Sequence, residues 1–303
     1  MNKYVLRQSL ILLLTAFIWG TAFVAQSAGM EYVGTFTFNA CRNVLGALVL
    51  IPVILFIRKT EMKKPDAELN SPAINVFNAA TVKGGIACGI ILCIASNLQQ
   101  HALKTASTGK AGFITALYIL MVPILGLFLK KRVGIKIWIG VVISLVGLYL
   151  LCLTDTTGLK PEDYLLFGCA FVFSLHITVV DHFSAEANGV AMSAIQFAVC
   201  AILSGIVMFI FENPVWTQIA DCAVPILYAG ILSSGVAYTL QIVGQKGMNP
   251  TIASMIMSLE SVFSALAGLV ILHQFLSGRE TLGCILMFAA IILAQLPDRK
   301  AAN

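Results

Sequence analysis

Long apolar runs dominate this sequence and restrict what it can fold into. Runs long enough to cross a bilayer occupy residues 9–28, 34–57, 83–102, 108–129, 133–153, 163–183, 189–211, 220–244, 249–272 and 277–296. A membrane-spanning helix needs about 20 apolar residues, whereas the strands of a membrane barrel alternate polar and apolar residues over about ten. The sequence therefore predicts an all-α membrane protein with ten transmembrane helices.

Composition supports a membrane environment and argues against a soluble domain. Only 11% of the residues are charged and 59% are hydrophobic, whereas soluble domains carry about 25% charged residues. The first run follows Lys3 and Arg7 like a signal peptide, but nine further runs follow it, so we expect a helix. The eight cysteines show no CxxC spacing. We therefore expect no disulfide framework, no metal site and no cofactor.

The basic residues predict the orientation of the chain in the membrane. With the N-terminus inside, 14 of the 19 Lys and Arg residues fall in inner segments and four fall in outer loops. Because inner loops of membrane proteins are enriched in Lys and Arg, both termini are expected to face the cytoplasm. The net charge of +5 then reflects orientation and not nucleic-acid binding. The partner it implies is the lipid bilayer, and the expected location is the cytoplasmic (plasma) membrane of a bacterium, as a multi-pass protein.

The two halves of the chain resemble each other. A shift of 142 residues aligns 95–131 with 237–273 without a gap and pairs Gln99 with Gln241. We therefore expect two repeats, 1–155 with helices one to five and 160–298 with helices six to ten. Because five is odd, the second copy enters the membrane from the opposite side, which predicts inverted repeats of the kind found in secondary transporters. The basic cluster 130–132 has no basic counterpart at His273 and Gln274, as inversion requires.

Polar side chains inside the predicted helices are candidates for a binding site, because they are costly in lipid unless they are satisfied. Gln99 and Gln241 hold equivalent positions in the repeat, and Tyr238 shares a helix face with Gln241. Glu260 is the one acid placed deep within a run, and its repeat partner is Tyr118. Three roles remain open for Glu260: a structural partner of a basic or hydroxyl group, a solute contact, or a proton-coupling site.

Further positions inside the runs have two interpretations each. Arg42 either lines or gates a pathway, or it ties its helix to a neighbour. His176 is either a packing residue or a site residue, and its near neighbour Phe173 matches Trp19 by repeat position. Pro123 removes a backbone hydrogen bond and is expected to kink the fourth helix at its middle.

These residues lie in segments that resemble the EamA-type transporters of the drug/metabolite transporter superfamily. The resemblance rests on Ala16-Phe-Ile-Trp-Gly-Thr, Arg42, Phe113-Ile-Thr-Ala-Leu-Tyr-Ile-Leu-Met-Val-Pro123 with the basic residues after it, and Leu259-Glu-Ser-Val-Phe263. It covers essentially the whole chain. One departure is His273-Gln274, where the family often has Gly-Glu.

The resemblance implies alternating access around a central cavity and export of small metabolites, amino acids or drugs. It places as candidate solute-binding residues Trp19, Gln99, Tyr118, His176, Tyr238, Gln241 and Glu260. A cavity lined by amides and aromatic rings with one acid suits a neutral, zwitterionic or weakly cationic small molecule, and protons are a candidate coupling ion. A channel or receptor-like scaffold is the alternative. An intramembrane enzyme is disfavoured because no acid-rich DDxxD-type run occurs.

Overall fold

The computed structural model describes residues 3–63, 74–106, 108–131, 133–152, 160–271 and 276–296, and these residues contain helices and no strands. In chain order the helices are α1 (Lys3–Gly29), α2 (Thr35–Glu61), α3 (Ala79–Ala102), α4 (Thr108–Thr115), α5 (Tyr118–Phe128), α6 (Ile135–Cys152), α7 (Pro161–Ser184), α8 (Gly189–Phe211), α9 (Trp216–Asp221), α10 (Ala223–Leu227), the π-helix η1 (Tyr228–Tyr238), α11 (Thr239–Gln245), α12 (Pro250–Met257), α13 (Glu260–Ile271) and α14 (Gly278–Gln295).

These helices form ten segments that are long and apolar enough to cross a bilayer. The prediction of an all-helical protein with ten candidate spans is therefore confirmed for the described residues. Three predicted spans prove to consist of several helices. The fourth is formed by α4 and α5, the eighth by α10, η1 and α11, and the ninth by α12 and α13. All eight cysteines are free thiols.

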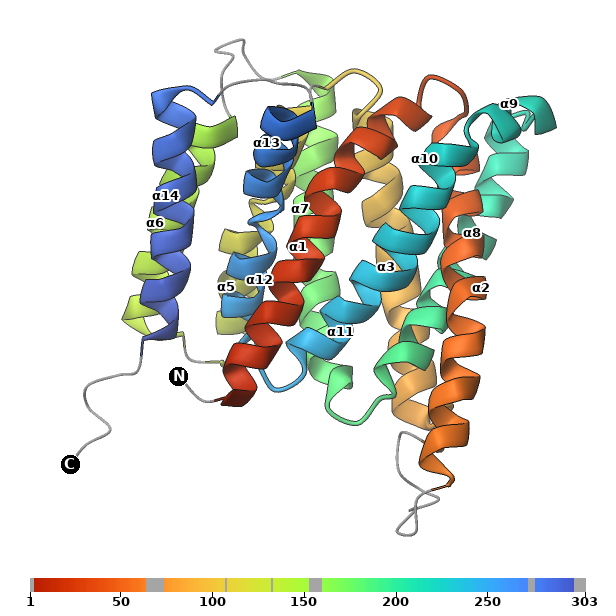
Figure 1. Ribbon diagram of the computed structural model, residues 1–303, viewed down its shortest axis with the longest axis horizontal. Helices are drawn as coiled ribbons and strands as arrows, with labels where there is room; N and C mark the ends of the chain where they lie inside the picture. Colours follow the sequence, from red (N-terminus) through yellow and green to blue (C-terminus); the bar gives the residue numbers. More distant parts are fainter. Residues whose placement is uncertain are drawn as a thin grey trace.

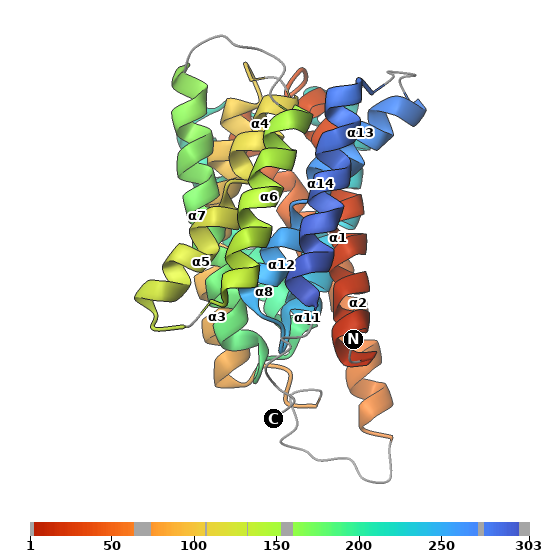
Figure 2. The ribbon, with the colours of Figure 1, turned by 90° about the vertical axis from the view of Figure 1, so that its left-hand side faces the viewer.

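The spanning helices lie roughly side by side in a bundle (Figure 1). We call the end at which α1 begins and α14 ends the lower end, and the opposite end the upper end. The turned view shows α6 and α14 packed together on one side of the bundle (Figure 2). On the other side α2 packs against α8 (Figure 1). Helix α1 crosses the middle, where it contacts α13, α11 and η1.

The fourth and ninth spans are both interrupted near the middle of the bundle, at positions that match in the repeat. Helix α4 ends at Thr115 and α5 begins at Tyr118, while α12 ends at Met257 and α13 begins at Glu260. At each break the backbone makes short-range bonds, from Leu117 N to Ile114 O (3.2 Å) and from Leu259 N to Ile256 O (3.2 Å). Pro123, where a kink is predicted, lies within α5, and the break in the fourth span precedes that helix.

Glycine allows close approach where α6 crosses α14. A Cβ added at Gly147 would lie 2.7 Å from the carbonyl oxygen of Gly283, and one added at Gly283 would lie 2.6 Å from that of Gly147. Each glycine thus faces the backbone of the other helix. Without a hydrophobic driving force between helices in lipid, contacts of this kind hold the bundle together through close packing.

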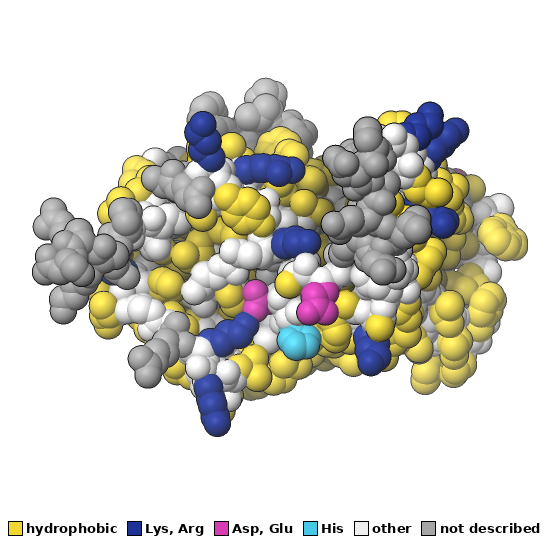
Figure 3. Space-filling view, turned by 90° about the horizontal axis from the view of Figure 1, so that it is seen from below, with side chains coloured by type: hydrophobic (Ala, Val, Ile, Leu, Met, Phe, Trp, Pro, Cys, Tyr) yellow, Lys and Arg dark blue, Asp and Glu magenta, His cyan; other side chains and the backbone are white. Residues whose placement is uncertain are grey.

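Basic side chains gather at the lower end of the molecule, which is seen from below in Figure 3. The described basic residues near this end are Lys3, Arg7, Arg58, Lys59, Lys63, Lys83, Lys130, Lys131, Lys136 and Lys246. Those near the upper end are Lys104, Lys110, Lys160 and Arg279. The basic cluster 130–132 was compared with His273 and Gln274 in the repeat; of these residues, Arg132, His273 and Gln274 lie outside the described residues. Among the described residues, Lys and Arg are thus more numerous at the lower end than at the upper end, in the same sense as the count of inner and outer segments made from the sequence.

Candidate functional site

A cavity lies in the middle of the bundle, at the level of the two helix breaks. It is lined by residues of both halves of the chain: Trp19, Phe23, Gln26, Arg42, Gln99, Thr115, Tyr118, Phe173, Ile177, Ser233, Tyr238, Gln241, Met257 and Glu260. The space that water can enter measures about 40 Å³, which holds only a few water molecules. Pockets for small molecules usually measure about 300–1,000 Å³, so this cavity is smaller than a typical small-molecule site.

The two helix breaks bring Tyr118 and Glu260 together at the cavity. The Tyr118 hydroxyl donates to Glu260 Oε1 over 3.4 Å. Each residue is the first of its helix, α5 or α13, and the two were paired in the sequence repeat. Glu260 lies at the first turn of α13, where the positive end of the helix dipole stabilises a carboxylate. The broken helices therefore bring the acid and its repeat partner to one point of the cavity.

Close packing between α1 and α13 holds Glu260 in this position. A Cβ added at Gly20 would lie 2.5 Å from the carbonyl oxygen of Glu260 and 2.8 Å from the backbone nitrogen of Ser264. Because these are backbone atoms, they cannot move aside as a flexible side chain could. Glycine at position 20 thus sets how near α1 lies to the helix that carries the acid.

Arg42 brings a positive charge to the same cavity, from α2. Its side chain is buried, with 2% exposed, and Nη1 donates to Gln26 Oε1 over 2.9 Å. The backbone of Gln26 is held from α3, because Gln100 Nε2 donates to the backbone carbonyl oxygen of Gln26 over 2.8 Å. Arg42 Nε has no hydrogen-bond partner among the described residues. Of the two interpretations left open by the sequence, Arg42 thus shows features of both: it lines the cavity and contacts a neighbouring helix.

Aromatic rings form one wall of the cavity. The rings of Trp19 and Tyr238 lie 4.6 Å apart, and Phe197, which does not line the cavity, packs edge-on against Tyr238 at 5.9 Å. His176 does not line the cavity: its ring stands edge-on to Tyr238 at 6.0 Å, and its Nε2 pairs with Gln196 Oε1 at 3.0 Å. The structure therefore places His176 among packed side chains behind Tyr238.

The amide side chains predicted as repeat partners both reach the cavity. Gln99 Nε2 donates to Thr115 Oγ1 over 3.4 Å, and Gln241 Oε1 has no hydrogen-bond partner among the described residues. The cavity thus includes six of the seven predicted solute-binding residues, all but His176, and Pro123 does not line it.

Phe23 and Gln26 line the cavity but are not among the residues predicted from the sequence. They follow Trp19 by four and seven residues respectively, and this spacing puts all three on one face of α1. That periodicity was the available signal. Ser233 and Met257 carry no such signal, because they belong to η1 and to the last turn of α12, whose irregular backbone the sequence did not reveal.

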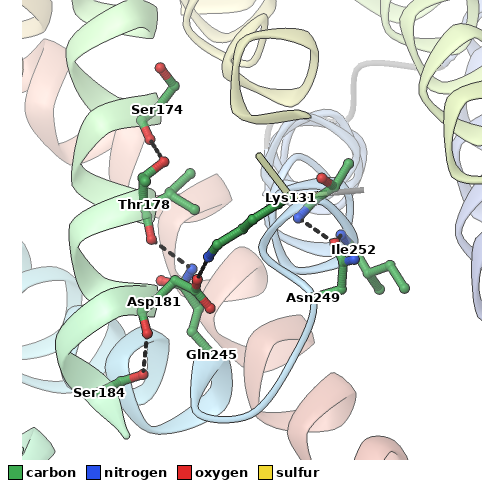
Figure 4. Close-up of polar contacts among 10 residues, drawn as sticks. Lys131, Ser174, Thr178, Asp181, Ser184, Gln245, Asn249 and Ile252 are labelled. Atoms are coloured by element: carbon green, nitrogen blue, oxygen red, sulfur yellow. Dashed lines mark hydrogen bonds and ion pairs between the residues drawn. The ribbon is translucent and has the colours of Figure 1, made fainter. Parts of the chain in front are cut away.

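Below the cavity, polar contacts tie α7 to its neighbours (Figure 4). Lys131 forms an ion pair with Asp181, which lies one turn below the cavity residue Ile177 on α7. Gln245 Nε2 donates to the backbone carbonyl oxygen of Ile177 over 3.4 Å.

The end of α5 positions Lys131 for its ion pair. Lys130 adopts a positive φ of 57°, and the backbone N–H of Lys131 donates to the carbonyl oxygen of Gly126 over 2.8 Å. This is the Schellman arrangement of a helix C-terminus.

Near the upper end, a second ion pair joins α4 to α7. Lys110 Nζ lies 2.6 Å from Asp163 Oδ2, and Lys160 N donates to the same oxygen over 2.8 Å. Asp163 is buried, so this pair is shielded from competing water. The fourth span is therefore tied to α7 on both sides of the cavity.

Known proteins similar to this chain are transporters by name. A protein of Archaeoglobus fulgidus described as an uncharacterized transporter is 26% identical over 288 residues, covering 94% of this chain and 84% of its own length. The uncharacterized transporters YwfM and YoaV of Bacillus subtilis are 24% and 23% identical, covering 96% and 91% of this chain and 95% and 92% of their own lengths.

A solved structure has the same fold. A crystal structure titled only as that of a protein matches with a TM-score of 0.75 at 21% identity, covering 95% of this chain and 96% of the other. The model of the EamA-like transporter family matches twice, at residues 7–153 and 160–296. Between them these two matches span nearly the whole chain, and together with the ten candidate membrane spans they show that the protein is a multi-pass membrane protein of the EamA-like transporter family.

Proposed function

We propose that this protein is a secondary transporter that moves a small neutral, zwitterionic or weakly cationic solute across the cytoplasmic membrane of a bacterium by alternating access, in the direction of export. The observation that carries the proposal is the cavity at the level of the two helix breaks. It lies in the middle of the bundle, combines amide, hydroxyl and ionisable groups with aromatic and aliphatic walls, and is too narrow for a solute in this conformation. A carrier requires such a site, which opens to one side at a time.

Inverted repeats, 1–155 and 160–298, would supply the two alternating states. Three observations support them: the family model matches each half, the two broken helices are interrupted at equivalent positions, and Tyr118 contacts its repeat partner Glu260. Interrupted helices at the midplane commonly form the solute sites of transporters with inverted repeats. The basic residues of the lower end would then face the cytoplasm, with both termini.

A channel or a receptor-like scaffold is the second candidate, and an enzyme is the third. Ion pairs on both sides of the cavity favour a carrier over a channel, because a channel needs a continuous open path. For an enzyme, the cavity lining offers a single carboxylate, in contact with the Tyr118 hydroxyl, and no histidine, cysteine, lysine or second acid. No ion or cofactor is needed to explain the lining.

Flux through reconstituted vesicles tests this function. A thermal-shift screen of the purified protein against amino acids, nucleobases, sugars and organic cations selects a radiolabelled solute. Proteoliposomes are then expected to exchange that solute saturably, and solute on the far side should accelerate the exchange. Protein-free liposomes are the control. An ohmic current, or conversion of the solute into a product, would contradict a carrier.

Proton coupling through Glu260 is a separate prediction, because this acid lies in the cavity with a hydroxyl as its contact. If Glu260 binds the coupling proton, Glu260→Gln loses the acceleration of flux by a pH gradient, while exchange at saturating solute without a gradient continues. Tyr118→Phe is the matched control, since it removes the hydroxyl and keeps the acid. Acceleration by the gradient in Glu260→Gln that equals the unmodified protein would exclude this role.

A further inference from the structure

A buried polar cluster lies between α2, α3 and α8, outside the central cavity. These three helices pack together on one side of the bundle (Figure 1). At the centre of the cluster are the thiols of Cys93 on α3 and Cys200 on α8, which are 8% and 0% exposed and hydrogen-bond to each other. Neither residue lines the cavity. The spacing of the cysteines in the sequence predicted no metal site, and these two meet only in the fold.

Each of the two sulfur atoms faces one amide and one hydroxyl group. Around Cys93 Sγ these are Asn97 Nδ2 at 3.4 Å and Ser204 Oγ at 3.5 Å. Around Cys200 Sγ they are Asn43 Nδ2 at 3.3 Å and Ser96 Oγ at 3.9 Å. Asn97 Nδ2 also donates to Ser204 Oγ over 3.0 Å, which leaves the serine hydrogen free to point at the sulfur. Donors of this kind stabilise a thiolate, which is the form of cysteine that binds metal ions.

Arg42 supplies a positive charge beside this pair of thiols. It lies within electrostatic range of Cys200, and its side chain is buried. In the part of the chain that the structure describes, Arg42 forms no ion pair, and its Nε has no hydrogen-bond partner. A guanidinium stays charged in proteins, and a buried charge normally acquires a counter-charge. A negatively charged group at the two sulfur atoms would provide one.

The small number of ligands restricts the ion that such a group could hold. The described residues contain no group of three or more His, Cys, Asp or Glu side chains that could hold a metal ion. Structural zinc takes four ligands, and Ca²⁺ and Mg²⁺ take six or more, mostly oxygen atoms. Thiolates favour Cu⁺, a soft ion. Cu⁺ and the chemically similar Ag⁺ accept two sulfur ligands in a linear arrangement, so a pair of thiols is sufficient for them.

We propose that Cys93 and Cys200 form a two-coordinate site for a soft monovalent metal ion of the Cu⁺ class. On binding, both S–H bonds break, two metal–sulfur bonds form and two protons leave to solvent. The bound unit then carries one negative charge, which the guanidinium of Arg42 balances. The ion would link α3 to α8 beside α2. This site is separate from the cavity and goes beyond the proposed function.

Metal titration of the purified full-length protein tests the site. Under anaerobic conditions, with a chromogenic Cu⁺ chelator as competitor, the reduced protein is expected to bind one Cu⁺ per chain. Cys93→Ser and Cys200→Ser should each weaken this binding by about hundredfold or more, since even changes behind the ligands cost about 10–100-fold. Asn97→Ala, which removes a donor to the sulfur, should weaken it by about tenfold. Cys88→Ser, which removes another buried thiol of α3, is the matched control and should bind like the unmodified protein.

X-ray absorption of the copper-loaded protein reads the ligands directly and does not depend on these variants. Two sulfur neighbours in a linear arrangement are expected. Size-exclusion profiles and melting temperatures identify serine variants that fail to fold. For these, a variant that keeps Cys93 and Cys200 and has alanine at the other six cysteines must still bind one ion with the same spectrum.

Three results would overturn the metal site. They are equal binding by Cys93→Ser, Cys200→Ser and Cys88→Ser, a spectrum with three or more sulfur neighbours, and no tight binding by protein whose thiols have been shown to be reduced. Solute flux is a separate measurement, so any of these results would leave the proposed function standing. Tight binding of Cu⁺ by a protein that exchanges no solute would sustain the site while the proposed function failed.

Discussion

Replacement of Gly20 by leucine is expected to abolish transport. An added Cβ would lie 2.5 Å from the carbonyl oxygen of Glu260 and 2.8 Å from Phe263 Cβ, so the side chain must push α1 away from α13. Overpacking of this kind costs about 1–3 kcal/mol, and here it also displaces the acid of the cavity. We expect solute exchange to fall below detection in Gly20→Leu, to fall in part in Gly20→Ala, and the melting temperature to drop in both.

The matched control is Gly205→Ala, on a membrane helix where an added Cβ would meet no atom within 4 Å. That variant should retain exchange and stability. If Gly20→Leu exchanged solute at the rate of the unmodified protein, close contact between α1 and α13 would not be needed for the site. Exchange rates in proteoliposomes and thermal melts of the detergent-solubilised protein measure both effects.

Breaking the ion pair between Lys131 and Asp181 is expected to open the lower half of the pathway. This pair ties the end of α5 to α7 one turn below Ile177, which lines the cavity. Its contribution is a closing contact and not a source of stability, since exposed pairs are worth at most about 1 kcal/mol. Asp181→Asn should therefore raise the population of states open at the lower end by about fivefold, the factor that 1 kcal/mol provides.

Cysteine labelling measures this opening. Ile177→Cys is introduced into a background without the eight native cysteines, and a membrane-impermeant thiol reagent is applied from the lower face. Labelling should quicken in Asp181→Asn and slow again when Lys131→Asp is combined with Asp181→Lys, which restores the pair with its charges exchanged. Glu186→Gln, an exposed acid at the same end, is the control. Unchanged labelling in Asp181→Asn would show that the pair does not close the pathway.

The sequence predicted the architecture well because the bilayer imposes simple rules. Each span must be long and apolar, since no water is available to satisfy the backbone inside the hydrocarbon. Ten apolar runs therefore gave ten spans, and their ends differ from those of the structure by a few residues. Where backbone irregularity entered, the sequence failed: the breaks at 116–117 and 258–259 and the π-helix η1 contain no proline and read as ordinary helix.

The sequence also indicated much of the cavity, through polar residues inside apolar runs. Trp19, Gln99, Tyr118, Tyr238, Gln241 and Glu260 line it together with Arg42. The same signal was misleading for His176, because burial of a polar residue does not say whether it faces a cavity or a neighbouring helix. His176 satisfies Nε2 through Gln196, and that contact depends on how α7 meets α8.

What the sequence alone determined is the class of protein, its spans and the set of polar residues that the membrane must accommodate, because these follow from local composition. Only the tertiary structure decided which of them meet. The Tyr118 hydroxyl reaches Glu260 across 142 residues of chain, and Arg42 donates its hydrogen bond to the Gln26 side chain on α1 and not to a backbone carbonyl. Such contacts depend on the close approach of helices at glycines such as Gly20. This packing cannot be predicted from the sequence, because it produces no periodic pattern of residue types.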